Sequence, residues 1–176
     1  RGDRVKIQTL GEEPGQKAPT LRGRHQLWKM LDYLDGIKPG EDVSLTDGIK
    51  NFCLHNSGKG IVVLISDLMY KEGYEAALRY LLAQDMDIYV IHVLSAEELE
   101  PEMQGDLRLV DCEDGDVAEI TVSGPLLRRY KQTLTAFVES AREFCNRRGI
   151  LYLMARNEVP VEELVTGYLR ERGLVR

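Results

Sequence analysis

The chain has 176 residues, 43% of them hydrophobic and 30% charged, which is typical of a soluble globular protein with one domain and its own core. Its net charge of −6 and isoelectric point near 5.2 argue against a nucleic-acid surface, because phosphate binding needs a clustered positive field. Three cysteines lie far apart without a CxxC pair, and they favour reduced thiols in the cytoplasm over disulfides or a zinc site: Cys53, Cys112 and Cys145.

The start of the chain predicts a piece of a longer protein. The sequence begins with Arg1 instead of methionine and enters directly into a strand-like segment, in which Val5, Ile7 and Thr9 alternate with other residues. No run of apolar residues is long enough to cross a bilayer and no signal peptide is present. The sequence leaves open whether a membrane anchor precedes this chain in the longer protein.

Two helices are expected before the most apolar stretch. After a half-exposed strand and a loop rich in Gly and Pro at 11–20, apolar residues at helical spacing predict a helix over 23–35, which Gly36 ends. A second helix is expected to start near Thr46, with Thr46 as its N-cap. Its inward residues are expected to be Ile49, Phe52 and Cys53.

The segment GIVVLISDL at 60–68 is the centre of the predicted fold. Its uninterrupted β-branched run predicts a strand buried on both faces. An amphipathic helix over 74–82 and a second apolar strand over 87–94 follow it. Strand, helix and strand at this spacing predict a parallel βαβ unit with a right-handed crossover.

The second half of the chain adds a hairpin, a long helix and a third strand. Ser95 and Glu98 form a capping box, and two short strands over 107–110 and 118–122 predict a hairpin at the edge of the sheet. A long helix is expected over 125–148, a buried strand over 150–154 and a last helix from Pro160. The fold class is therefore α/β, an open and mostly parallel sheet flanked by helices in a single domain over 1–176.

Most catalytic signatures are absent from the sequence. There is no GxSxG elbow and no GxGxxG loop, and Ser57-Gly58-Lys59-Gly60 lacks the spacing of a phosphate loop. The three histidines share no spacing, and His92 inside the second apolar strand is more often a core histidine than a ligand or a base.

Oxygen ligands are the chemistry that the sequence does offer. Asp67 follows a predicted parallel strand, where open α/β sheets bind ligands, and Thr46-Asp47 stands at a helix start. Together they could hold a hard cation such as Mg²⁺ above the edge of the sheet. The alternative is two unconnected caps, with Thr46 on a helix and Asp67 on a turn.

A resemblance covers essentially the whole chain. GIVVLISDLM, a helix, and then DIYVIHVLSAEELEPEMQGDLRLVDCEDGD resemble the bacterial von Willebrand factor A-like family known as domain of unknown function fifty-eight. The segments GDRV and RGRHQL, the loop at Thr46-Asp47, the helix with Tyr130, GILYLM and PVEELV fit the same pattern. The part from Gly60 to Gly115 is the most specific.

The resemblance implies a metal-ion-dependent adhesion site. Such a site takes DxSxS from a first strand, a threonine from a second loop and an aspartate from a third. Thr46 corresponds to the threonine and Asp67 to the aspartate, with Asp47 behind them. The segment at 42–46 imitates DxSxS, but no apolar strand precedes it, so the true element and its strand and helix are expected upstream of Arg1. This chain then holds part of a site, which could be vestigial, and Mg²⁺ is expected only in the full-length protein.

Three functions follow from these patterns. The leading hypothesis is a non-catalytic protein-interaction domain that works with a MoxR-type AAA+ ATPase, the partner class that the resemblance implies, in assembly or maturation of other complexes. The first alternative is a small Mg²⁺-dependent phosphoryl-transfer enzyme that uses Asp67, with Asp47 and Lys71 as the nearest supporting residues. Phosphorylation of Asp67 as in a receiver domain is a weaker variant. The second alternative is a structural module with a vestigial site.

Overall fold

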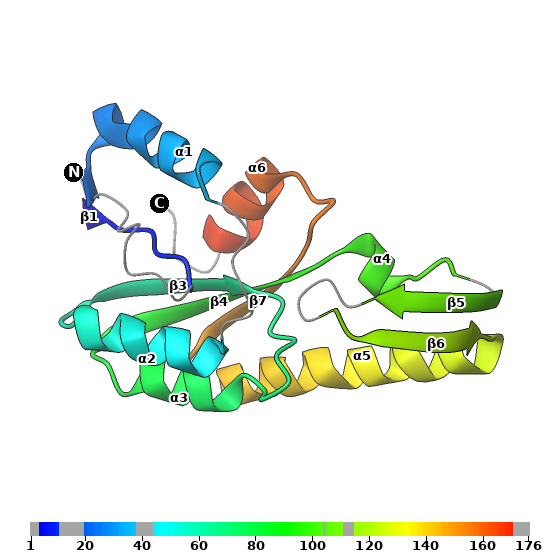
Figure 1. The fold of residues 1–176 in the computed structure, drawn as a ribbon. Coiled ribbons are helices and arrows are strands. Elements are labelled where there is room, and N and C mark those ends of the chain that lie inside the picture. Colours follow the sequence, from blue (N-terminus) through cyan, green and yellow to red (C-terminus); the bar gives the residue numbers. More distant parts are fainter. Residues whose placement is uncertain (1–3, 11–19, 38–43, 104, 111–114, 171–176) are drawn as a thin grey trace.

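Three parallel strands lie at the centre of the structure, a computed structural model that describes residues 4–10, 20–37, 44–103, 105–110 and 115–170 (Figure 1). They are β3 (Gly60–Ser66), β4 (Met86–Leu94) and β7 (Leu151–Arg156), in the order β3-β4-β7. Helix α3 (Glu75–Leu82) connects β3 to β4, so the predicted parallel βαβ unit is confirmed. The α/β fold class is likewise confirmed.

The register of the sheet brings the ends of the strands together. Ser66 at the end of β3 lies opposite His92 of β4, and His92 lies opposite Met154 of β7. Because the strands are parallel, their carboxyl ends share one edge of the sheet, and the residues after β3 begin there. Asp67 is the first of them.

One face of the sheet carries the main core. Helices α2 (Leu45–His55), α3 and α5 (Gly124–Asn146) lie on that side in Figure 1. The core contains Leu64 and Val90 from the strands together with apolar residues of these helices, among them Ile49, Leu78, Leu81, Ala141 and Cys145. The inward residues predicted for α2 are confirmed, since Ile49 is buried and Phe52 and Cys53 pack against the same core.

The opposite face is covered only in part. Helix α6 (Val161–Glu163) continues into the π-helical turn η2 (Leu164–Leu169), and Leu164 and Val165 pack on Ile91 and Ala155. Over β3 the described residues provide no such cover, so alternate side chains are exposed: Ile61 by 56%, Val63 by 40% and Ile65 by 66%. The prediction that this strand is buried on both faces is therefore wrong, because β3 lies at an edge of the described sheet and helices pack on one side of it.

The N-terminal segment forms less sheet than the sequence predicted. Strand β1 (Arg4–Val5) pairs antiparallel with β2 (Leu21–Arg22), and the residues that follow β1 are not strand. A 3₁₀ turn, η1 (Arg24–Gln26), leads into α1 (Leu27–Asp35), so the predicted helix is confirmed. No residue of α1 is buried, and its single tryptophan, Trp28, is 74% exposed.

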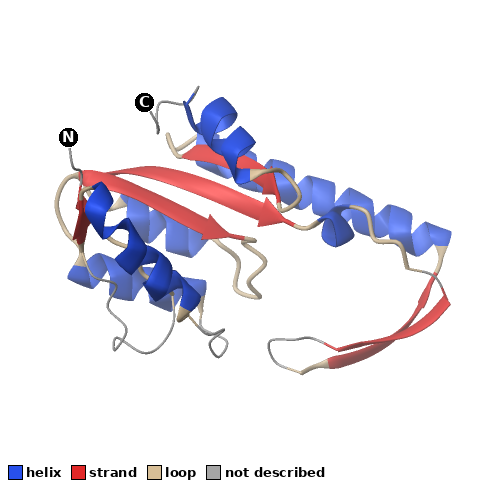
Figure 2. Cartoon of the chain, turned by 90° about the horizontal axis from the view of Figure 1, so that it is seen from above, coloured by secondary structure: helices blue, strands red, loops and turns tan. Residues whose placement is uncertain are grey.

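The hairpin forms a sheet of its own. Strands β5 (Gly105–Val110) and β6 (Val117–Val122) pair only with each other in the described residues, after the short helix α4 (Ala96–Leu99). Both views show the hairpin beyond the end of the parallel sheet (Figures 1 and 2). The prediction of a hairpin is confirmed, but its predicted place at the sheet edge is wrong. One of its faces carries Asp106, Arg108 and Glu119, which could not be buried under a helix without charged partners.

The remaining smaller predictions concern helix caps and cysteines. The capping box of Ser95 and Glu98 is present in full, and Pro125 occupies the first turn of α5. Cys53 and Cys145 are free thiols, and burial raises the pKa of both, so they are neutral. Cys112 lies outside the described residues. No helix in the described part of the chain is both long and apolar enough to cross a membrane.

Candidate functional site

The turn after β3 contains Leu68, the one non-glycine residue with a positive φ in the described part of the chain. Leu68 has φ of 60°, in the left-handed region that a leucine rarely adopts, and its side chain is fully buried. Two hydrogen bonds hold the turn: the Leu68 amide donates to Ser66 Oγ at 3.0 Å, and the Met69 amide donates to Asp67 Oδ1 at 3.1 Å. Strained backbone persists only where its surroundings fix it, and it is concentrated at functional sites.

Asp67 is exposed on this turn. Its carboxylate accepts the Met69 amide, so the prediction that Asp67 caps a turn is confirmed. The cap leaves the side chain at the surface, at the carboxyl end of the parallel strands. Capping and recognition are therefore compatible roles for the same carboxylate.

Thr46 lies at the start of α2, but it is not the N-cap. That position belongs to Ser44, whose Oγ accepts the Asp47 amide at 3.2 Å, so the predicted cap is wrong by two residues. Ser44 has the extended ψ of 123° that an N-cap requires, and Leu45 enters the core, which moves the helix start forward. Thr46 is instead the second residue of the helix.

Glu72 binds this helix start from the loop that follows Asp67. Its Oε1 lies 2.5 Å from Ser44 Oγ and 3.1 Å from the Thr46 amide nitrogen. The Ser44 hydroxyl and then the Thr46 amide lower the pKa of Glu72, because both donate to its charged form. The loop after β3 is thus tied to α2 through a carboxylate that the sequence did not single out.

The two supporting residues of the phosphoryl-transfer hypothesis form ion pairs with other groups. Asp47 Oδ1 lies 2.9 Å from Lys50 Nζ on the same helix. Lys71 Nζ lies 3.7 Å from Asp116 Oδ2, which connects the loop after β3 to the start of β6. These contacts give that hypothesis no support.

The described residues do not fit a complete metal site. Among them, no group of three or more His, Cys, Asp and Glu side chains could hold a metal ion together. The Thr46 amide and the Ser44 hydroxyl are both engaged with Glu72, while Asp67 accepts the Met69 amide. Thr46 therefore donates its amide to Glu72 while Asp67 accepts the Met69 amide, and the hydrogen bonds of the described residues do not join the two.

His92 was interpreted from the sequence as a core histidine, and its burial confirms that interpretation. It is fully buried at the edge where Asp67 lies, and its Nδ1 is 2.6 Å from the hydroxyl of Tyr152. Burial lowers the pKa of His92, although the Asp67 backbone carbonyl and carboxylate act in the opposite direction. Yet no partner meets hydrogen-bonding geometry at Nε2 within the described residues.

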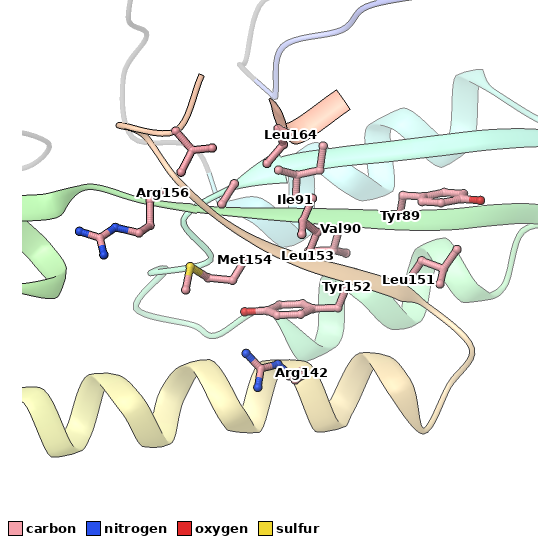
Figure 3. A pocket seen from close by; sticks show the side chains of 12 residues that line it. Tyr89, Val90, Ile91, Arg142, Leu151, Tyr152, Leu153, Met154, Arg156 and Leu164 are labelled. Atoms are coloured by element: carbon pink, nitrogen blue, oxygen red, sulfur yellow. The ribbon is translucent and has the colours of Figure 1, made fainter. Parts of the chain in front are cut away.

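A hollow of about 440 Å³ lies at the other edge of the sheet, around β7 (Figure 3). Its lining comes from both faces of that strand, with Tyr152 and Arg142 on the α5 side and Ile91 and Leu164 on the other. Arg142 pairs with Glu139 at 2.8 Å, and Arg156 pairs with Glu158 at 3.0 Å. The hollow therefore lies along the edge strand β7, and each of the two arginines that line it has an acidic partner.

Comparison with known proteins identifies the family. A family model described as protein of unknown function DUF58 matches residues 1–142. The chain belongs to this family. Thr46, Asp67 and His92 lie inside the part that matches the DUF58 model, whereas β7 with Tyr152 follows it. Searches of curated proteins and of solved structures returned no match.

Proposed function

We propose that this DUF58 chain is a non-catalytic protein-interaction domain whose recognition surface is the carboxyl edge of the parallel sheet around Asp67. The observation that carries the proposal is the exposed Asp67 carboxylate on a turn that is strained at Leu68 and held by two hydrogen bonds. A fixed turn loses little conformational entropy on binding, which favours recognition.

The surface extends beyond Asp67. Through Glu72 the loop after β3 is bound to α2, and through Lys71 and Asp116 it reaches the hairpin. Asp67 therefore stands between two elements that a partner could contact at the same time. A carboxylate in that place suits a partner that presents a basic or hydrogen-bond-donating group.

The partner to test first is a MoxR-type AAA+ ATPase, the class implied by the resemblance to von Willebrand factor A-like domains. In this proposal the chain acts with the ATPase in the assembly or maturation of other complexes. The recognition needs no covalent chemistry and, with the residues described, no bound metal.

The experiment measures binding of the chain to a purified MoxR-type ATPase from the same organism by calorimetry. Asp67→Asn is expected to weaken binding about tenfold, the effect of a central interface residue. Asp85→Asn is the matched control, because Asp85 is an exposed aspartate just before β4, at the amino end of the strands. Equal effects of the two substitutions, or no binding by the unsubstituted chain, would overturn the proposal.

The same proteins test the enzymatic alternative. Turnover of a phosphate ester by the chain, lost in Asp67→Asn and kept in Asp85→Asn, would favour phosphoryl transfer over recognition. We expect no turnover in any of the three proteins.

A further inference from the structure

We infer that His92 is a positioning residue for the Asp67 turn: its Nε2–H donates to the backbone carbonyl of Asp67, while the Tyr152 hydroxyl holds Nδ1 as an acceptor. The inference deepens the proposed function, on which it rests for the importance of Asp67. The geometry that carries it comes from three neighbouring strands.

The place of His92 in the sheet is the first step. His92 belongs to the middle strand, opposite Ser66 in β3 and opposite Met154 in β7. Its side chain is fully buried, with its ring edge-on to Phe137 of α5 at 5.8 Å between centroids. A polar group in such a place is costly unless both ring nitrogens find partners.

Tyr152 decides which nitrogen carries the proton. The hydroxyl and Nδ1 are 2.6 Å apart, and one of the two must donate. Burial raises the pKa of Tyr152, so the phenol keeps its proton and can donate it. Nδ1 then accepts, and in a neutral imidazole the proton must sit on Nε2.

In the other tautomer, with the proton on Nδ1, the lone pair of Nε2 would face a lone pair of the Asp67 carbonyl oxygen. Asp67 follows Ser66, which lies opposite His92 in the register of the sheet, and the backbone carbonyl of Asp67 raises the pKa of the imidazole, as an acceptor close to the ring does. A deprotonated Nε2 would meet that oxygen with its lone pair, whereas Nε2–H can donate to it. Nε2 is also the one buried side-chain polar atom for which the described residues provide no hydrogen bond of good geometry.

The result is a line of contacts from β7 through β4 to the turn after β3. It fixes the carbonyl of Asp67, just before the strained Leu68, to the centre of the sheet. A hydrogen bond to the carbonyl at this point helps to hold a backbone conformation that leucine alone would avoid. His92 thereby acts on recognition through Asp67 and without touching the partner.

The first test reads the tautomer in the unsubstituted chain. Nitrogen-15 spectra of the imidazole, recorded well above pH 6.5, distinguish a protonated from an unprotonated ring nitrogen. We expect a protonated Nε2 and an unprotonated Nδ1. The opposite assignment would overturn the inference, and a role in packing alone would not fix either tautomer.

The second test compares two tyrosines. Tyr152→Phe removes the hydroxyl that binds Nδ1 of His92. Tyr74→Phe is the control: it removes a hydroxyl that lies 3.4 Å from Ser140 Oγ, and the Tyr74 ring, like that of His92, packs on Phe137. Hydrogen exchange of the Leu68 and Met69 amides, relative to that of Val90, should be about fivefold faster in Tyr152→Phe, the effect of losing one hydrogen bond. Equal ratios in the two variants would overturn the inference.

Failure of the inference and failure of the proposed function give different results. If Tyr152→Phe loosens the turn but the ATPase does not bind the unsubstituted chain, His92 positions a turn that serves another purpose. If the ATPase binds through Asp67 while Nδ1 carries the proton, the function stands and the positioning role does not.

Discussion

The Nδ1 atom of His92 lies 2.6 Å from the hydroxyl oxygen of Tyr152, inside the sheet and next to the exposed turn of Asp67. This pair joins the middle strand to β7, and Ser66 of β3 lies opposite His92, one residue before Asp67. A buried histidine whose pKa is lowered by burial is thereby connected to the candidate recognition surface, so the stability of this region depends on pH.

The free energy of unfolding is expected to fall as the pH drops below about 6.5, the unfolded value for histidine. Burial lowers the pKa of His92 in the folded chain, against smaller opposing effects of Asp67 and Glu98. Between the two pKa values the unfolded state binds a proton that the folded state does not, so acid favours unfolding. Urea titrations at a series of pH values measure this slope.

His92→Gln is expected to remove that slope, whatever its effect on absolute stability. His25→Gln is the control, because His25 is exposed in the turn before α1. The contribution of Glu72 falls in a separate window: its pKa is lowered from 4.5, so its stabilisation is lost only as the pH falls below that value. An unchanged slope in His92→Gln would contradict the prediction.

Leu68→Gly is expected to be more stable than Leu68→Ala by about 0.5–1 kcal/mol, although both lose about 2–4 kcal/mol with the buried side chain. The order follows from the φ of 60°, which glycine adopts without strain and alanine does not. The same pair of substitutions at Leu78, which is equally buried but helical, should give the reverse order. Denaturation of the four variants measures these differences in stability. If the same variant, glycine or alanine, were the more stable at both positions, the prediction would be wrong.

The fold was largely predictable because its strongest signals are local. Apolar periodicity located α3, α5 and the three parallel strands, and the spacing of β3, α3 and β4 predicted their parallel pairing. The exposure of Ile61, Val63 and Ile65 was not predictable, because an apolar run shows that a strand can be buried and does not show what covers it. The hairpin itself was predicted, but its separation from the parallel sheet was not, for the same reason.

The site was predictable only in part. The position of Asp67 after a parallel strand pointed to the turn, but the backbone strain at Leu68 has no sequence signal in a residue that usually avoids φ > 0. The contact of Glu72 with Ser44 joins residues 28 apart, and that of His92 with Tyr152 joins residues 60 apart. Such pairs depend on tertiary packing, which residue spacing does not encode.

Addition of Mg²⁺ is expected to leave the thermal midpoint of this chain unchanged. A ligand that binds the folded state raises the midpoint by mass action, and the described residues bring no group of three metal-binding side chains together. Thermal melts with MgCl₂ and with KCl at equal ionic strength test this. A rise with Mg²⁺ alone that Asp67→Ala abolishes would show that the chain holds a working site.

Ser44→Ala is expected to destabilise the chain by about 1 kcal/mol, the usual loss for an N-cap, and Thr46→Ala by less. Ser44 Oγ accepts the Asp47 amide and donates to Glu72, whereas Thr46 binds Glu72 mainly through its backbone amide, which alanine keeps, and less through its side chain. Because Ser44 and Glu72 share a hydrogen bond, Ser44→Ala and Glu72→Gln should not be additive in a double-mutant cycle. Leu54→Ala, at a position of α2 that is 82% exposed, is the control and should combine additively with Ser44→Ala. A larger loss in Thr46→Ala than in Ser44→Ala would restore Thr46 as the cap and contradict the assignment of Ser44.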